Sequence, residues 1–205
     1  MTAVKICGLT RPEDVEAACA LGAAYVGFNF VASSPRRTTR LHARDLKSIC
    51  PPGVLRVGVF ADEDWALIRG AVGMLELDLV QLHRRLTEEE VASSPVPVIA
   101  VARPSGGSFA VPRHDILVRC HAVLFDPSEG SGTALDPDRI EEASWPVPVI
   151  VAGGLTPDNV GDVIRRLRPA GVDVASGVES APGVKDRGKL ERFFAAVREA
   201  DARAL

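Results

Sequence analysis

Short hydrophobic runs recur along the whole chain, and polar residues gather in the segments between them. Each run is rich in β-branched residues and nearly continuous in its hydrophobicity, which is typical of parallel strands covered on both faces. The pattern therefore predicts eight strands, over residues 3–7, 25–30, 55–60, 77–83, 96–102, 121–126, 147–152 and 172–176.

Amphipathic segments separate most of these strands and predict helices. After the seventh strand, apolar residues repeat every three or four positions, at Val160, Val163, Ile164 and Leu167. Thr156 and Pro157 predict the start of this helix, as its N-cap and first helical residue. Thr10 and Glu13 likewise predict a capping box for the helix after the first strand.

The stretch from Arg103 to Asp115 interrupts this alternation. It contains two glycines and two prolines, at Pro104, Gly106, Gly107 and Pro112. Such residues break regular structure, so we expect a loop, with at most one helical turn, in place of the fifth helix.

Strands that alternate with helices predict an α/β protein. In a chain of 205 residues, eight strand–helix units fit a closed (β/α)8 TIM barrel best. An open doubly wound sheet is the alternative, although eight strands would crowd it. No linker or low-complexity stretch divides the chain, so we expect a single domain over residues 1–205. No Gly-x-Gly-x-x-Gly turn follows the first strand, which disfavours a dinucleotide site.

Composition narrows the possible partners. The formal net charge is −3, with acids and bases interspersed, so neither nucleic acid nor an anionic membrane surface is expected as a partner. No apolar run approaches the roughly 20 residues of a membrane span, and no export signal is recognisable at the start. Four cysteines lie far apart, which disfavours a disulfide framework. We expect a cytoplasmic protein with a small-molecule ligand.

Glycines follow the last two predicted strands. Gly153 and Gly154 lead into a helix, and Ser176 and Gly177 follow the eighth strand. Glycine lets backbone N–H groups approach a ligand closely, and a helix N-terminus favours an anion. Paired after strands seven and eight, these residues predict a phosphate site. The alternative is that each glycine only forms a tight turn.

Two strands end in residues suited to proton transfer. Cys7 ends the first strand and Asp126 the sixth, and the active site of such a barrel lies at these ends. A thiol with a lowered pKa and a carboxyl with a raised one can act as base and acid near neutral pH. Taken singly, Cys7 fits a packed core thiol and Asp126 a turn residue before Pro127.

Three further side chains belong to this end of the predicted barrel or to its interior. Lys5 has the strand parity of Cys7, so it should point inward, where a buried cation needs a partner; Asp173 is the best candidate. Arg36 lies in a basic segment after the second strand and suits bidentate recognition of a carboxylate, or forms a solvated turn. For His83 two interpretations stay open: it donates a hydrogen bond to a substrate, or it caps the end of its strand.

Six groups of residues, in order along the chain, share a wider pattern. They are KICGLT at 5–10, GFNF at 27–30 with SPR at 34–36, QLH at 81–83, LFD at 124–126 with GSG at 130–132, AGGLTPDNV at 152–160, and DVASGVE at 173–179 with PGVKD at 182–186. Together they resemble the phosphoribosylanthranilate isomerases, and the resemblance spans nearly the entire chain.

The resemblance implies an isomerase of tryptophan biosynthesis. It would convert N-(5′-phosphoribosyl)anthranilate to 1-(o-carboxyphenylamino)-1-deoxyribulose 5-phosphate by an Amadori rearrangement, with no cofactor and no metal. It implies that Cys7 is the general base, that Asp126 is the general acid and that Arg36 binds the anthranilate carboxylate. The backbone at Gly154 and Ser176-Gly177 would bind the phosphate, in a monomer or homodimer.

The chain departs from the usual family pattern at three places, and two other functions stay open. Arg84 stands where glycine is usual after Gln-Leu-His, Ala175 where serine often stands, and residues 130–133 read GSGT.

A histidine-pathway or dual-substrate aminoaldose–ketose isomerase is one alternative function. Those enzymes resemble this barrel but have a carboxylate where Cys7 stands. The other is a non-catalytic barrel that binds sugar phosphates.

Overall fold

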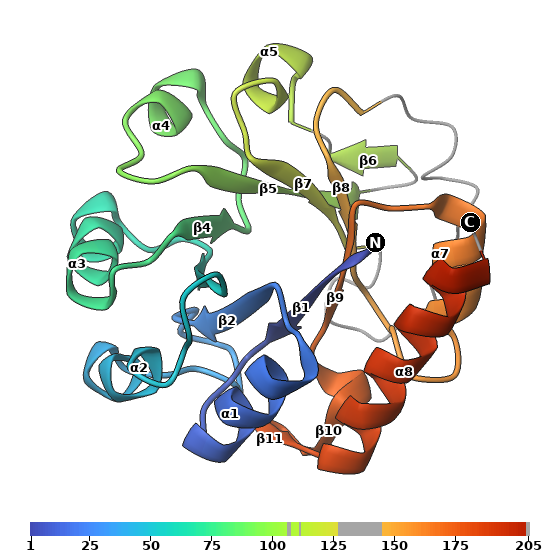
Figure 1. Cartoon of the computed structure of the whole chain (residues 1–205). Helices are drawn as coiled ribbons and strands as arrows, with labels where there is room; N and C mark the ends of the chain where they lie inside the picture. Colours follow the sequence, from blue (N-terminus) through green and yellow to red (C-terminus); the bar gives the residue numbers. More distant parts are fainter. Residues whose placement is uncertain (106–107, 111, 127–144, 204–205) are drawn as a thin grey trace.

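The computed structural model describes residues 1–105, 108–110, 112–126 and 145–203. Within these ranges, eight parallel strands form a closed barrel with helices outside it (Figure 1). They pair in the order β1-β2-β3-β4-β5-β7-β8-β9, and β9 pairs with β1 to close the ring. The strands are β1 (Ala3–Cys7), β2 (Tyr25–Asn29), β3 (Leu55–Phe60), β4 (Leu79–Leu82), β5 (Val98–Ser105), β7 (Ala122–Phe125), β8 (Val149–Val151) and β9 (Gly171–Val174). The predicted TIM barrel is confirmed.

Helices connect the strands and cover the outside of the barrel. They are α1 (Pro12–Leu21), α2 (Arg40–Lys47), α3 (Trp65–Leu75), α4 (Glu88–Ala92), α5 (His114–Leu117), α7 (Val160–Leu167) and α8 (Arg187–Arg203). The 3-10 turn η1 (Ser176–Val178) and the hairpin β10 (Glu179–Ala181) and β11 (Val184–Lys185) lie between β9 and α8. None of the described helices is long and apolar enough to cross a membrane.

The fifth connection is more ordered than the predicted loop. β5 continues to Ser105 and pairs with the antiparallel strand β6 (Ser108–Ala110), with Arg103 opposite Ala110. The single helical turn α5 follows and includes His114 and Asp115. Proline is tolerated where a strand leaves the main sheet, because no neighbouring ladder there needs its missing N–H.

Both predicted helix starts are wrong in detail. At α1 the N-cap is Arg11, without a side-chain cap, because the Thr10 hydroxyl instead donates to the carbonyl of Gly183. The predicted start at Pro157 lies in a turn, and α7 begins at Val160. The predicted apolar stripe of α7 is nonetheless buried or packed against the core.

Alternate residues of each strand face the barrel interior, which positions the site. The interior layer contains Val57, Leu79, Ile99, Val101, Ala122, Leu124, Ile150 and Ala152. The residues between them pack outward against the helices. By this parity, Lys5 and Cys7 on β1 and Asp126 after β7 share the interior face, because Asp126 lies two residues beyond Leu124.

Candidate active site

A buried ion pair lies inside the barrel below its carboxyl-terminal end. Lys5 and Asp173 are opposite each other in the β1–β9 ladder, and Lys5 Nζ donates to Asp173 Oδ1 at 2.9 Å. The predicted pair is therefore confirmed. Burial lowers the pKa of Lys5, but Asp173 and Cys7 more than offset this, so the pKa is raised and the ammonium stays charged.

Cys7 lies directly above this pair. A Cβ built on Gly27 of β2 would be 3.1 Å from Cys7 Sγ and 3.2 Å from Lys5 Nζ. Sulfur and ammonium therefore share the space that the missing side chain of Gly27 leaves free. Cys7 is 8% exposed, so the thiol is covered in this structure more fully than an open catalytic group would be.

Burial also determines the state of the thiol. Burial raises the pKa of Cys7; the charges of Lys5 and Lys185 lower it but do not offset the burial. The thiol is consequently protonated near neutral pH in this state. A lowered pKa, the simplest condition for a base at this position, is not what the surroundings produce.

Asp126 belongs to the same group of side chains. It follows β7, and its N–H donates to the carbonyl of Ala102 on β5 at 3.1 Å. Asp126 also interacts electrostatically with Asp173. Burial is the main cause that raises the pKa of Asp173, and the negative charge of Asp126 raises it further. Cys7, Lys5, Asp173 and Asp126 thus form one electrostatically coupled cluster in the barrel mouth.

Arg36 does not lie free in a solvated turn. Its Nε donates to Glu179 Oε1 at 2.9 Å, and its Nη2 donates to Oε2 at 2.7 Å. This bidentate pair raises the pKa of Arg36 and lowers that of Glu179 despite burial. The stem of Arg36 packs on Gly8, where a Cβ would be 2.5 Å from Arg36 Cδ. Gly8 also has a φ of +70°. A side chain at this position is therefore disfavoured both by the contact with Arg36 and by the left-handed backbone conformation.

Lys185 holds the other side of Glu179. Its Nζ donates to Glu179 Oε1 at 2.8 Å, to the carbonyl of Cys7 at 2.7 Å and to that of Ala175 at 3.1 Å. The ammonium therefore ties together the ends of β1 and β9 and the carboxylate that holds Arg36. Burial lowers the pKa of Lys185, and Glu179 acts in the opposite direction.

The predicted phosphate residues form two loops in contact. Gly153 and Gly154 follow β8 with φ of +85° and +65°, and Ser176 and Gly177 lie in η1. A Cβ on Gly177 would be 1.8 Å from the carbonyl oxygen of Leu155. Only glycine permits this approach. The N–H groups of Gly153 and Gly154 donate to no acceptor within the described residues, which suits an anion site.

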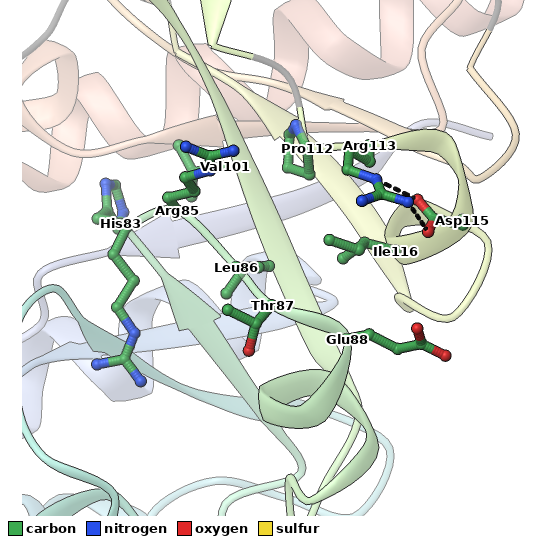
Figure 2. Close-up of a pocket in the computed structure, with 11 residues that line it drawn as sticks. His83, Arg85, Leu86, Thr87, Glu88, Val101, Pro112, Arg113, Asp115 and Ile116 are labelled. Carbon is green, nitrogen blue, oxygen red and sulfur yellow. Dashed lines mark hydrogen bonds and ion pairs between the residues drawn. The ribbon is translucent and has the colours of Figure 1, made fainter.

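His83 lies in a different part of the mouth. One of its ring nitrogens is 2.6 Å from Gln81 Nε2, and the side chain lines a cavity of about 650 Å³ (Figure 2). The cavity is bounded by the segment after β4 and by the start of α5, where Arg113 and Asp115 form an ion pair. Neither Cys7 nor Asp126 lines this cavity.

Arg84, the departure from the family pattern, lines the same cavity as His83, but its guanidinium is held by other segments. Its Nη1 donates to the carbonyls of Ala61 and Glu63, its Nη2 pairs with Glu90, and its guanidinium lies over Trp65. The side chain thus joins the loop after β3 to α4. The unusual residues 130–133 lie outside the described ranges.

Sequence reasoning missed Glu179 and Lys185 as members of the site. Both occur in recognised motifs, but their only signal was a charged residue in each of two short segments after the last strand. As for metals, the described residues contain no group of three His, Cys, Asp or Glu that could hold an ion.

Comparison with known proteins adds a family to this geometry. Residues 4–196 match the family described as N-(5′-phosphoribosyl)anthranilate (PRA) isomerase. The N-(5′-phosphoribosyl)anthranilate isomerase of Dechloromonas aromatica is 37% identical over 203 residues, which cover 98% of either chain.

Two solved structures are similar over the same length. The phosphoribosyl anthranilate isomerase of Thermus thermophilus has a TM-score of 0.85 at 35% identity, covering 97% of this chain and 99% of that one. A phosphoribosyl anthranilate isomerase in complex with reduced 1-(o-carboxyphenylamino)-1-deoxyribulose 5-phosphate has a TM-score of 0.78 at 32% identity, covering 97% and 100%.

Proposed function

Since the chain belongs to the N-(5′-phosphoribosyl)anthranilate isomerase family and is an isomerase of tryptophan biosynthesis, we propose that Cys7 and Asp126 carry its proton transfers. The observation that supports this assignment is the shared cluster. Both residues lie at interior-facing positions, Cys7 at the end of β1 and Asp126 just after β7, and both interact electrostatically with the Lys5–Asp173 pair. An acid and a base at two points of one mouth fit a reaction that adds one proton and removes another.

In this mechanism Asp126 protonates the ring oxygen of the ribosyl group, and the ring opens to an iminium ion. The iminium acidifies the hydrogen on the neighbouring carbon C2′, and the Cys7 thiolate removes it. The resulting enolamine tautomerises to the aminoketone. The substrate's own nitrogen holds the electron pair in the intermediate, so the proposed reaction uses neither cofactor nor metal.

The raised pKa of Cys7 requires that the thiol gives its proton to water before the thiolate removes the hydrogen from C2′. Lys5 Nζ lies beside the sulfur and stabilises the thiolate once it forms. The resting thiol and the reactive thiolate thus differ by one proton in a site that already holds the compensating cation. The base is scarce at neutral pH but strong, because a high-pKa thiolate is the better proton acceptor.

Substrate binding in this proposal uses both ends of the mouth. The phosphate lies on the backbone of Gly153, Gly154, Ser176 and Gly177, where amide groups lack protein acceptors among the described residues. The anthranilate carboxylate meets the guanidinium of Arg36. His83 contacts the bound substrate from the side of the cavity after β4. The expected cytoplasmic location and the monomeric or homodimeric state belong to the same proposal.

The test is the fluorescence of phosphoribosylanthranilate, which falls as the enzyme consumes it. Cys7→Ser and Asp126→Asn should each lower kcat by at least about 100-fold, the usual effect of removing a general base or acid. Cys19→Ser on α1 and Asp45→Asn, an exposed residue of α2, make the same changes away from the mouth. Near-full activity in either mouth variant, with the controls active, would refute that residue's role.

A further inference from the structure

Three charged side chains meet at the edge of the mouth although they come from distant segments. Arg36 follows β2, Glu179 begins β10 and Lys185 ends β11. Their side chains are 21%, 3% and 0% exposed, respectively. Arg36 is therefore the member of the cluster that a ligand can reach, while Glu179 and Lys185 lie behind it.

The net charge of this cluster is positive. Arg36 paired with Glu179 alone would be neutral overall and would attract a carboxylate weakly. Lys185, within 2.8 Å of the same Glu179 oxygen, adds a second cation to one anion. The trio therefore carries a net charge of +1, and the exposed guanidinium presents it.

The hydrogen bonds also leave one edge of the guanidinium unused by Glu179. Glu179 takes Nε and Nη2, which is one of the two edges on which the group can bind a carboxylate in bidentate fashion. The opposite edge, formed by Nη1 and the second N–H of Nη2, makes no hydrogen bond within the described residues. With its stem packed on Gly8, the guanidinium cannot rotate away without losing that contact.

We propose that Glu179 and Lys185 are positioning residues for carboxylate recognition: Glu179 fixes the guanidinium of Arg36 with its free edge toward the substrate, and Lys185 keeps the cluster positive. This inference rests on the proposed function, because it assumes that Arg36 binds the anthranilate carboxylate. It adds that the affinity for this carboxylate depends on two residues that do not touch it.

Each residue has an informative substitution. In Glu179→Gln, the remaining oxygen can accept from Lys185 and from Arg36 Nε, but the amide NH2 faces Arg36 Nη2, so the guanidinium loses its charged bidentate partner. In Lys185→Met, the Arg36–Glu179 pair stays but is neutral. Glu179→Asp keeps the charge on a shorter side chain and should restore part of the function. Glu191→Gln removes an exposed ion pair of α8 and is the matched control.

The experiment compares two substrates that differ only in the carboxylate: phosphoribosylanthranilate and N-(5-phosphoribosyl)aniline, with the products of both separated by chromatography. For phosphoribosylanthranilate, Glu179→Gln and Lys185→Met should each raise KM at least about tenfold, the effect expected from one lost charge-assisted hydrogen bond. In Glu179→Gln kcat should be nearly unchanged, whereas Lys185→Met should also lower kcat on both substrates, because the charge of Lys185 lowers the pKa of Cys7. For the aniline analogue, KM should stay as in the wild type. Thermal melting of every variant establishes that it is folded.

The outcomes separate this inference from its premise. Equal increases in KM for both substrates would mean that Glu179 and Lys185 only support the fold, and the inference would be wrong. Arg36→Ala tests the premise, because it should impair only the substrate with the carboxylate. If Arg36→Ala discriminates between the substrates and the folded Glu179 variants do not, the positioning role fails while the role of Arg36 stands. If Arg36→Ala does not discriminate, both fail.

Discussion

The contact between Gly177 and Leu155 offers a direct test of the phosphate site. In the structure, η1 after β9 presses against the loop after β8, and a Cβ on Gly177 would be 1.8 Å from the Leu155 carbonyl oxygen. The next atoms, Leu155 C and Thr156 Cα, would be 2.9 and 3.2 Å away. These neighbours are backbone atoms, so they cannot turn aside as a flexible side chain would. Gly177→Ala therefore moves one loop away from the other.

The size of this movement follows from ordinary contact distances. A carbon and a carbonyl oxygen approach to about 3.3 Å, so the loops must separate by roughly 1.5 Å. Overpacking of this kind costs about 1–3 kcal/mol of stability. A displacement of about 1 Å in a group that positions the substrate can lower activity by two orders of magnitude. We therefore expect Gly177→Ala to lower kcat/KM for phosphoribosylanthranilate about 100-fold.

The assay must distinguish lost phosphate binding from general damage. Inorganic phosphate should inhibit the wild-type enzyme competitively, and its inhibition constant should rise at least about tenfold in Gly177→Ala, equivalent to about 1.4 kcal/mol of lost binding. Gly73→Ala on α3 is the matched control, since a Cβ there would meet no atom within 4 Å. Both variants are checked by thermal melting before kinetics.

One result would refute this reasoning. If Gly177→Ala is folded and phosphate inhibits it as strongly as it inhibits the wild type, the anion does not lie between these loops. A loss of kcat/KM without a change in phosphate inhibition would place the damage elsewhere in the mouth.

Two further predictions concern the thiol and Arg84. Because burial raises the pKa of Cys7, the thiolate fraction should still be increasing at about pH 8.5, where an ordinary thiol is half ionised. Asp126→Asn removes the opposing ionisation of the acid, so the residual kcat/KM of this variant should increase with pH up to and beyond this value; a profile of Asp126→Asn that is flat between neutrality and this value contradicts the prediction. Arg84→Gly removes the contacts to Ala61, Glu63 and Glu90 from a side chain that is 15% exposed. It should lower the free energy of unfolding by about 1–3 kcal/mol in urea titrations, with kcat/KM little changed; a large loss of activity without a loss of stability would instead place Arg84 in substrate binding.

Features that depend on strand periodicity could be predicted from the sequence. Alternation within the strands fixes which side chains face inward, and a barrel places the first strand beside the last one. These two facts sufficed to pair Lys5 with Asp173. The glycines after the last two strands were recognised for a similar reason, because a positive φ or a close approach leaves few alternatives to glycine.

Features that depend on irregular segments could not be predicted in this way. Thr10 has the sequence of a capping residue, but a carbonyl 173 positions away competes for its hydroxyl. Arg36 and Glu179 are separated by 143 positions, and both lie outside the barrel strands, where no periodicity defines a face. Local sequence preferences predict which hydrogen bonds form within a segment. The contacts of Thr10 and Arg36 instead depend on which distant loops the closed barrel brings together.

The polar contacts concentrate where the barrel closes, between β1 and β9. Lys5 pairs with Asp173 across this ladder, and Lys185 donates to the carbonyls of Cys7 and Ala175 at the ends of the same two strands. A one-residue slip of either strand would turn every side chain of that strand to its other face. It would also break the buried ion pair and the three hydrogen bonds of the Lys185 ammonium. Closure of the barrel and the arrangement around the thiol therefore depend on the same strand register. The position of Cys7 at this seam links the reactivity proposed for it to the correct pairing of the first and last strands.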